Sequence, residues 1–314
     1  MKNKFNDKKC APGVKYEDGS CFSHNSLLEI AKEYNIKFPN KEKINVKLSK
    51  PELVEKINII FKDNCTDQVC WKNQKLVKLI NNEEIHNGTF VPEGPEGKYE
   101  WLSTTDINDV LEQYQNVHKD FLFLGAVPYD FEDLPSLGIA TLNFKQLMLE
   151  GKTKIGLVIN LDEHYKSGSH WVALYTDLLK NQIYYFDSVA KGPKKRIKKF
   201  VNKITKFLYE KNFKRKINIT SIKKKLKIIS KKKNKSYLIN NDIDLKNLLN
   251  SNFDIKFNNI QHQFKNSECG VYSINFIIRL VNGESFNNII KNITDDETMN
   301  KYRQAIFSRK IENT

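Results

Sequence analysis

Long hydrophobic runs are missing from this 314-residue sequence: no stretch of about 18 consecutive apolar residues occurs, so we expect no membrane-spanning helix. The N-terminal residues MKNKFNDKKCAPG also lack the apolar centre of a secretory signal. Cysteine is scarce, and its count of five is odd. Together these absences argue against a disulfide-rich secreted scaffold and favour free thiols in a reducing compartment.

The compositional bias of disordered or fibrous chains is absent as well. Hydrophobic residues make up 39% of the sequence and charged residues 28%, and we find no internal repeat. A chain of this length buries enough surface for a complete core without disulfides. It has room for one large domain or two smaller ones.

Positive charge is plentiful, but it is concentrated in one segment. The net charge is +15, and residues 191–235 contain 18 lysines and 2 arginines against one acid, Glu210. This local balance of +19 leaves the rest of the chain at −4. A solvated helix face and a Lys-, Asn- and Ile-rich proteome both explain such a run, and nonspecific contact with nucleic acid is the functional alternative. Interleaved aromatic residues are few, so base stacking is not indicated.

Residues 1–95 are predicted to form a mostly helical accessory region. SHNSLLEIAKEYN is typical of a helix capped by Ser23 or Asn25, and PELVEKINIIFKDN of a helix with Pro51 in its first turn. NQKLVKLINNEEI is a weaker third candidate. FVPEGPEGKYEW contains two prolines and two glycines, so we place a domain boundary in it and a second domain over residues 96–314.

The second domain mixes strand-like and helix-like segments, which predicts an α+β fold. Three segments rich in β-branched and aromatic residues should be strands, and the last two, joined by a short polar turn, should pair antiparallel: 154–161, 170–177 and 182–188. A Lys-rich helix follows, and we treat about 191–250 as a Lys-rich insertion that is at least partly mobile. A further strand begins near Asp254, and a buried helix is expected over 269–283.

Two residues of the predicted hairpin are suited to acid–base chemistry. His170 begins one strand, and Asp187 closes the next. With the turn near residues 178–181 the two fall close to opposite each other, so the Asp187 carboxylate can orient the imidazole. The plainer alternatives are a surface histidine and an aspartate that caps the following helix.

Cys269 differs from the other cysteines because it starts the predicted buried helix. The positive end of a helix favours a thiolate there, and Gly270 would let a substrate backbone approach closely. Gln263 lies six positions earlier, where its amide could donate to an oxyanion beside the Cys269 N–H. Alternatively, Cys269 is a small buried hydrophobe and Gln263 an ordinary strand-end amide.

These residues resemble a known family. HWVALY, then YYFDS, then Gln263-x5-Cys269-Gly-Val-Tyr resemble the cysteine proteases that include the SUMO-processing proteases and the adenovirus proteinase. WLSTTDI is similar to the helix that opens the SUMO-protease core, with Ser103 and Thr104 in place of Asn and Asp. LGAVPYDFEDLP, GKTKIGLVINLDEHYKSGSHWVALY and GSCFSHNSLLEIAKEYN resemble more closely the virion-processing proteases of large nucleocytoplasmic DNA viruses.

The resemblance implies a papain-like, adenain-like core in which a central mixed sheet is flanked by helices and the catalytic cysteine starts a buried helix. A helical N-terminal accessory region precedes this core. The implied activity is a cysteine endopeptidase that cleaves viral structural polyproteins or core proteins at Gly-Gly-x sites during virion maturation. It would need no cofactor or metal and would act in the host cytoplasm and the virion core.

The resemblance also implies roles for individual residues. Cys269 would be the nucleophile, His170 its base, Asp187 the group that orients the base, and Gln263 the oxyanion donor. The indoles of Trp171 and Trp101 would wall a narrow tunnel, and their flat faces would leave room only for glycine.

Other functions stay open. The chain could remove ubiquitin or a ubiquitin-like modifier such as SUMO, or it could be a basic nucleic-acid-binding or structural core protein with an incidental thiol. His262, next to Gln263, is an alternative base. A structural zinc site fits poorly, because the spacings Cys-x10-Cys and Cys-x4-Cys are unusual for one; the residues concerned are Cys10, Cys21, Cys65, Cys70 and His24.

Overall fold

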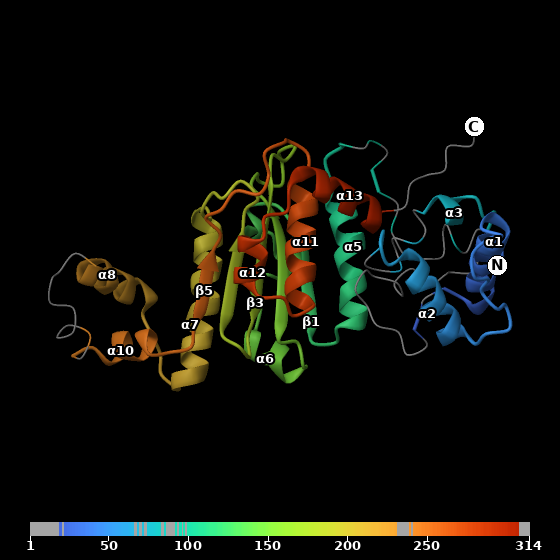
Figure 1. Ribbon diagram of the computed structural model, residues 1–314. Coiled ribbons are helices and arrows are strands. Elements are labelled where there is room, and N and C mark those ends of the chain that lie inside the picture. The colour runs from blue at the N-terminus through green and yellow to red at the C-terminus, as the bar shows by residue number, and fades with distance from the viewer. Residues whose placement is uncertain are drawn as a thin grey trace. The chain divides into compact units, whose positions relative to one another are not determined.

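The computed structural model describes residues 19–20, 22–65, 101–230 and 241–307, together with residues 68, 71, 74–82, 85, 92, 94–95, 97, 99–100 and 239 (Figure 1). Its α-helices are α1 (His24–Lys37), α2 (Lys50–Phe61), α3 (Lys75–Lys78), α5 (Thr104–Val117), α6 (Phe144–Leu149), α7 (Lys195–Phe213), α8 (Ile219–Ser230), α10 (Ile243–Leu249), α11 (Cys269–Val281), α12 (Phe286–Lys291) and α13 (Asp296–Ile306). Its strands are β1 (Phe121–Val127), β2 (Lys154–Asn160), β3 (Trp171–Asp177), β4 (Gln182–Phe186) and β5 (Asp254–Phe257). Two short 3-10 helices follow β1, η2 (Phe131–Asp133) and η3 (Pro135–Leu137). In this part of the chain no helix is long and apolar enough to cross a membrane.

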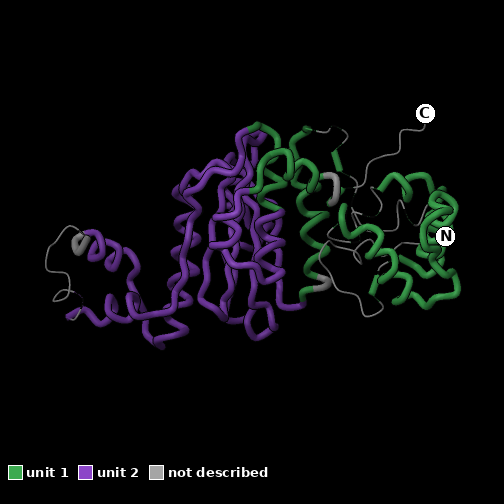
Figure 2. The backbone as a smooth tube through the Cα atoms, viewed as in Figure 1, with its two compact units in different colours: residues 1–118, 265–274, 294–314 green, residues 119–264, 275–293 purple. Residues whose placement is uncertain are grey.

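The chain divides into two compact units (Figure 2). The N-terminal unit takes its described residues from 1–118, 265–274 and 294–314. The sheet unit consists of 119–264 and 275–293. The predicted domain boundary near residue 95 is a different division of the chain, and it stays a prediction.

The helices of the N-terminal region form where the capping residues predicted them. Ser23 accepts a hydrogen bond from the N–H of Ser26 at the start of α1. Ser49 and Glu52 form a capping box at the start of α2, with Pro51 in its first turn. The third predicted helix is shorter than expected, covering only Lys75–Lys78. The apolar faces of these helices close a core of their own, which includes Phe22, Leu27, Ile30, Leu53, Ile57, Phe61 and Trp71.

The sheet unit is built on a mixed sheet of five strands in the order β1-β2-β3-β4-β5. The two outer pairs, β1 with β2 and β4 with β5, are parallel. The inner pairs, β2 with β3 and β3 with β4, are antiparallel, as the short turn between 177 and 182 predicts. Strand β1 was missed in the sequence, because the apolar run FLFLGAV lacks the alternation that marks a half-buried strand.

Helices cover both faces of this sheet. On one face α6 and α7 pack on side chains such as Leu157, Leu174 and Tyr185. On the other face Phe186 stacks on Phe276 of α11 with ring centroids 4.8 Å apart. Gly156 of β2 lies on this second face, where an added Cβ would stand 2.9 Å from the Phe121 ring and 3.2 Å from Ile277. The predicted α+β class with a central mixed sheet flanked by helices is confirmed.

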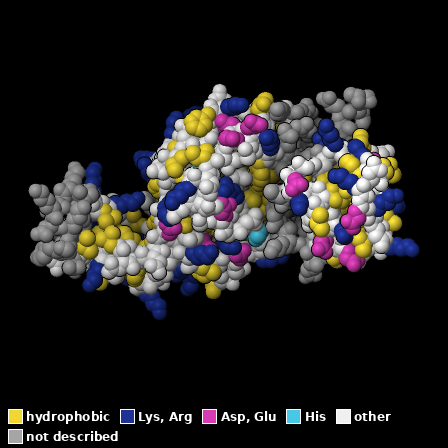
Figure 3. Space-filling model, viewed as in Figure 1, with side chains coloured by type: hydrophobic (Ala, Val, Ile, Leu, Met, Phe, Trp, Pro, Cys, Tyr) yellow, Lys and Arg dark blue, Asp and Glu magenta, His cyan; other side chains and the backbone are white. Residues whose placement is uncertain are grey.

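The Lys-rich segment is structurally divided. Helix α7 packs its apolar side into the sheet core through Ile197, Phe200, Val201, Ile204 and Leu208, so this part of the predicted insertion is a core helix. Helices α8 and α10 instead join the end of α7 in a small separate cluster, which includes Ile222 and Leu245. In Figure 3 the charged side chains visible over α8 and α10 are basic, whereas both signs are mixed over the sheet.

Candidate active site

His170 and Asp187 contact each other through their side chains in the sheet unit. His170 lies directly before β3, and its carbonyl accepts a hydrogen bond from the N–H of Leu161 at 2.8 Å. Its Nε2 lies 2.7 Å from Oδ1 of Asp187, whose residue is completely buried. The pairing of Ala173 with Phe186, extended by one residue, places Asp187 opposite Val172 rather than opposite His170. The two side chains therefore meet diagonally on one face of the hairpin, a reach that neighbouring strands allow.

The backbone of Asp187 is held by a residue that the sequence analysis did not single out. The buried side chain of Asn258 accepts a hydrogen bond from the N–H of Asp187 at 2.8 Å and donates one to its carbonyl at 2.7 Å. The N–H of Val189 donates to Oδ1 of the carboxylate at 3.0 Å. Oδ2 is buried without a hydrogen-bond partner among the described residues. Among the described residues, the His170 ring is the basic group that contacts this carboxylate.

Gln263 is buried and fixed by Ser188, the residue after Asp187. The hydroxyl of Ser188 donates to Oε1 of Gln263 at 2.6 Å. The N–H of Gln263 donates to the Ser188 carbonyl at 2.9 Å. The side-chain amide is therefore oriented with its Oε1 end toward Ser188 and its Nε2 end directed away from it.

His262, the alternative base, has a packing environment of its own. Its ring is buried edge-on against Phe186 with centroids 5.4 Å apart, and Nε2 lies 3.3 Å from the Ile290 carbonyl. Burial lowers the pKa of His262, because the charged imidazolium loses its hydration, and the nearby Arg279 lowers it further. These contacts account for His262 as a neutral core histidine.

A second His–Asp pair in the sheet unit escaped the sequence analysis. Nδ1 of His164 lies 2.6 Å from Oδ2 of Asp130, and the N–H of His164 donates to Oδ1 at 2.9 Å. Burial alone would raise the pKa of Asp130, but the hydrogen bonds from His164 outweigh it and the net direction is downward. Because the His164 side chain is 53% exposed, this pair differs from His170–Asp187 mainly in its access to solvent.

Trp171 and Trp101, the predicted tunnel walls, have very different surroundings. Trp171 is the first residue of β3 and only 7% of its surface is exposed. Trp101, in the N-terminal unit, is 51% exposed, so its indole is open to a ligand. Ser103, two residues further, forms a capping box with Asp106 at the start of α5. This capping role explains why a serine stands at this position of WLSTTDI. The tunnel itself stays a prediction.

Cys269 is the first residue of α11 and carries a free thiol. Its carbonyl accepts a hydrogen bond from the Ser273 hydroxyl at 2.9 Å, one turn along the helix. Gly270 is closely approached by the chain itself: a Cβ there would lie 3.0 Å from the Cβ of Leu102. Leu102 therefore explains why a glycine is needed at this position, and the close approach of a substrate backbone stays a prediction.

A buried arginine in the N-terminal unit supports the turn before Cys269. Nε of Arg303, on α13, donates to Glu268 Oε2 at 3.1 Å, and both side chains are almost fully buried. The Arg303 guanidinium also donates to the Ser267 carbonyl at 3.1 Å and to the Glu100 carbonyl at 2.5 Å. One side chain thus holds both the residue before Cys269 and the residue before Trp101.

The other cysteines give no metal site in the described chain. Cys65 is disulfide-bonded, which differs from the expectation of free thiols throughout. Cys10, Cys21 and Cys70 lie outside the described residues. No group of three or more His, Cys, Asp or Glu side chains suited to a metal ion occurs among the residues that the structure describes.

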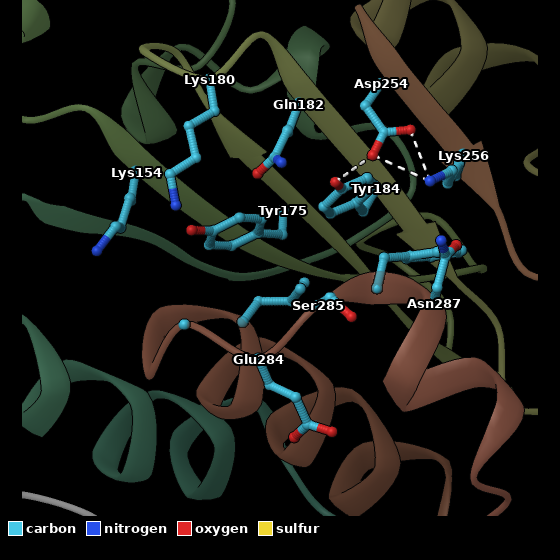
Figure 4. Close-up of a pocket in the computed structure, with 13 residues that line it drawn as sticks. Lys154, Tyr175, Lys180, Gln182, Tyr184, Asp254, Lys256, Glu284, Ser285 and Asn287 are labelled. Atoms are coloured by element: carbon cyan, nitrogen blue, oxygen red, sulfur yellow. Dashed lines mark hydrogen bonds and ion pairs between the residues drawn. The ribbon is translucent and has the colours of Figure 1, made fainter.

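A pocket of about 230 Å³ lies elsewhere on the sheet unit, lined by residues that include Lys154, Tyr175, Gln182 and Asp254 (Figure 4). These residues lie at the start of β2, the end of β3 and the start of β4 and β5. His170 and Asp187 lie near the other ends of β3 and β4, so the pocket and that pair are at opposite ends of the same two strands.

Two lysines that line this pocket are paired with carboxylates. Lys154 lies 2.9 Å from Asp120, and Lys256 lies 2.8 Å from Asp254, which also accepts a hydrogen bond from Tyr184 at 2.6 Å. Burial raises the pKa of Tyr184 well above its usual value, so its hydroxyl stays protonated. No cysteine or histidine is among the residues that line it.

Comparison with known proteins identifies the family. Residues 145–313, which include all four predicted catalytic residues, match the family described as Ulp1 protease family, C-terminal catalytic domain. The chain is 32% identical over 308 residues to the thiol protease R355 of Acanthamoeba polyphaga mimivirus, covering 93% of this chain and 90% of that protein. It is 22% identical over 232 residues to cysteine protease S273R of African swine fever virus, covering 69% of this chain and 71% of that protein.

A solved structure shows the same fold. The crystal structure of the pS273R protease of that virus matches 97% of this chain and 97% of its own chain, with a TM-score of 0.53 and 18% identity. The identity is low, so this likeness bears on the fold and not on the chemistry. The family match and the mimivirus relative bear on the chemistry, and they confirm the resemblance seen in the sequence. The chain therefore belongs to the Ulp1 protease family through its C-terminal catalytic domain, and it is a cysteine-type peptidase.

Proposed function

We propose that the protein is a cysteine endopeptidase that cleaves viral structural polyproteins or core proteins at Gly-Gly-x sites during virion maturation. The observation that carries the proposal is the 2.7 Å pair between His170 and the buried Asp187, in a peptidase whose free thiol, Cys269, starts a helix. Two viral relatives named as proteases support a viral setting. We place its action in the host cytoplasm and the virion core.

The proposed mechanism is acyl transfer by Cys269. Nε2 of His170 is engaged by Asp187, which assigns Nδ1 to proton exchange with the thiol. The thiolate attacks the scissile carbonyl carbon and forms a tetrahedral oxyanion, to which the Gln263 amide and the Cys269 N–H donate. The intermediate collapses to a thioester as the imidazolium protonates the leaving amine. Water, deprotonated by His170, then hydrolyses the thioester and regenerates the thiol.

The first test compares two histidine variants. His170→Ala and Cys269→Ala should abolish cleavage of an internally quenched Gly-Gly-x peptide, because each removes a group that the chemistry requires. His164→Ala is the matched control, since it breaks the other His–Asp pair of the sheet unit and should leave cleavage nearly unchanged. Cleavage retained by purified His170→Ala, or lost in His164→Ala alone, would refute the assignment of the base.

Removal of a ubiquitin-like modifier is the alternative substrate class within the same chemistry. Ser103 and Thr104 stand where the SUMO-processing proteases have Asn and Asp, and Ser103 serves as a helix cap here. We therefore favour the peptide substrate. A fluorogenic substrate made from a modifier's C-terminus, run beside the Gly-Gly-x peptide, separates the two, and faster turnover of the modifier would favour the isopeptidase.

Contact with nucleic acid through residues 191–235 is a separate proposal. Some of these lysines already have partners within the sheet unit: Lys199 pairs with Glu132 at 3.2 Å, and Lys203 donates to the Ala140 carbonyl at 2.7 Å. The pKa of Lys223 is lowered, mainly because burial disfavours its charged form and further because Lys198 lies near it. Binding to duplex DNA should weaken steeply with salt if several of these lysines contact phosphates.

A further inference from the structure

Ser188 links the two halves of the proposed catalytic machinery within the sheet unit. It follows Asp187 directly, two residues after β4 ends at Phe186. Both Ser188 and Gln263 are almost fully buried, although they lie 75 residues apart in the sequence. The strand end therefore presents one side chain to the base and the next to the amide of Gln263.

Two hydrogen bonds tie Gln263 to Ser188. The Ser188 hydroxyl donates to Oε1 at 2.6 Å, and the Ser188 carbonyl accepts from the Gln263 N–H at 2.9 Å. A glutamine amide presents an acceptor at one end and two donors at the other, and rotation about its last bond exchanges them. In this structure the hydroxyl donates to Oε1, which corresponds to the orientation in which Nε2 is directed away from Ser188.

We propose that Ser188 is a positioning residue that orients the Gln263 amide as an oxyanion donor. This inference rests on the proposed function, in which Nε2 of Gln263 donates to the oxyanion. An oxyanion donor is effective when it is already aimed at the developing charge, because no reorganisation is then needed during the reaction. In the opposite orientation Oε1 would face the oxyanion and repel it.

The backbone around Ser188 is held by several hydrogen bonds. The Asn258 side chain holds both backbone groups of the preceding Asp187, at 2.8 and 2.7 Å. The Ser188 carbonyl also accepts from the N–H of His262 at 2.9 Å. The short Asp187–Ser188 turn thus sets the direction of the base through one side chain and that of the oxyanion donor through the other.

The test is a double-mutant cycle on the full chain, with the Gly-Gly-x peptide as substrate. Gln263→Ala should lower kcat by about 10²–10³-fold, as loss of one oxyanion donor does in other enzymes. Ser188→Ala should lower kcat about 10-fold with KM changed less than about 2-fold, because the amide then holds its donating orientation in only about a tenth of the molecules. In the Gln263→Ala background the same Ser188→Ala change should cost less than about 2-fold, since no donor remains to be oriented.

Alkylation of Cys269 by iodoacetamide separates this role from a general loss of structure. Alkylation needs the thiolate but forms no oxyanion, so its rate in Ser188→Ala should stay within about 2-fold of wild type. Thr176→Val is the matched control, because it removes another buried hydroxyl of the sheet, which donates to the Gln182 carbonyl at 2.7 Å. It should leave kcat, KM and the alkylation rate unchanged.

Each contrary result has a distinct meaning. Multiplicative effects of Ser188→Ala and Gln263→Ala, or a loss of alkylation in Ser188→Ala, would show a merely structural role and overturn the inference. An unchanged kcat in Ser188→Ala, with a low kcat in Gln263→Ala, would also overturn it while leaving the oxyanion donor in place. An unchanged kcat in Gln263→Ala would refute the proposed role of Gln263 itself.

Discussion

Replacement of Arg303 by methionine tests whether the turn before Cys269 depends on a buried ion pair. In the N-terminal unit, Arg303 pairs with Glu268 and donates to the carbonyls of Ser267 and Glu100. Arg303→Met leaves the Glu268 carboxylate buried without its cation and removes the donor from both carbonyls. The variant keeps most of the apolar volume of the side chain, so the loss is mainly electrostatic.

The expected cost is large. Breaking a buried ion pair by removing one partner typically destabilises a protein by about 3–5 kcal/mol, because an uncompensated charge stays buried. The side chains of Arg303 and Glu268 are only 5% and 2% exposed, so we expect about 4 kcal/mol. The double variant Glu268→Gln/Arg303→Met removes the stranded charge and should regain about 1–3 kcal/mol relative to the single change. Urea denaturation followed by circular dichroism measures these differences.

A more exposed arginine–glutamate pair provides the control. Arg279 binds Glu284 through two hydrogen bonds of 2.6 Å, but the two side chains are about a quarter exposed. Arg279→Met should therefore cost roughly 1 kcal/mol, since solvent screens a pair of this kind. The reasoning fails if Arg303→Met costs no more than Arg279→Met, or if adding Glu268→Gln makes Arg303→Met less stable.

Three further predictions concern single residues. Asp187→Asn should lower kcat by about 10²–10⁴-fold with little change in KM, because an amide neither fixes the His170 tautomer nor stabilises the imidazolium. A kcat within about 3-fold of wild type would contradict the proposed triad. Burial lowers the pKa of His262 below its ordinary 6.5, so the unfolded state binds more protons and the free energy of unfolding falls as pH drops below about 6.5. His262→Gln should make the free energy of unfolding less dependent on pH over that range. Equal pH dependence in the variant and the wild type would contradict this. Gly270→Ala places a Cβ 3.0 Å from Leu102 and should lower the melting temperature. Adding Leu102→Ala to that variant should partly restore the melting temperature. A Gly270→Ala variant more stable than wild type would show that the Leu102 side chain moves aside at little cost.

Local sequence signals predicted several helices and the β3–β4 hairpin with little error. Ser23 and Pro51 marked the starts of two helices, and the apolar run after Cys269 predicted α11, which ends at Val281 with Gly283 two residues beyond in a left-handed conformation. The turn between the aromatic segments predicted the β3–β4 hairpin. These features depend on capping and periodicity over a few residues, which neighbours along the chain largely determine.

Elements whose burial depends on distant packing were predicted less well. β1 is an edge strand whose sequence does not alternate polar and apolar residues, so the sequence does not distinguish it from a buried helix segment. The lysines of α7 masked a stripe of apolar residues that packs into the sheet core. Charge density along a segment says little about which face of a helix is buried.

The sequence by itself determined the family, the cysteine-type chemistry and the residues that could carry it, because short motifs in a specific order record residue types and spacings. It did not determine what holds those residues. The pairing of Asp187 with His170 runs diagonally rather than directly across the hairpin, and the Asn258 side chain that fixes Asp187 comes from 71 residues further along the chain. The hydroxyl of Ser188 reaches Gln263 across 75 residues. Only the tertiary structure decides such contacts, because the direction of a side chain depends on strand register and packing that no local pattern specifies.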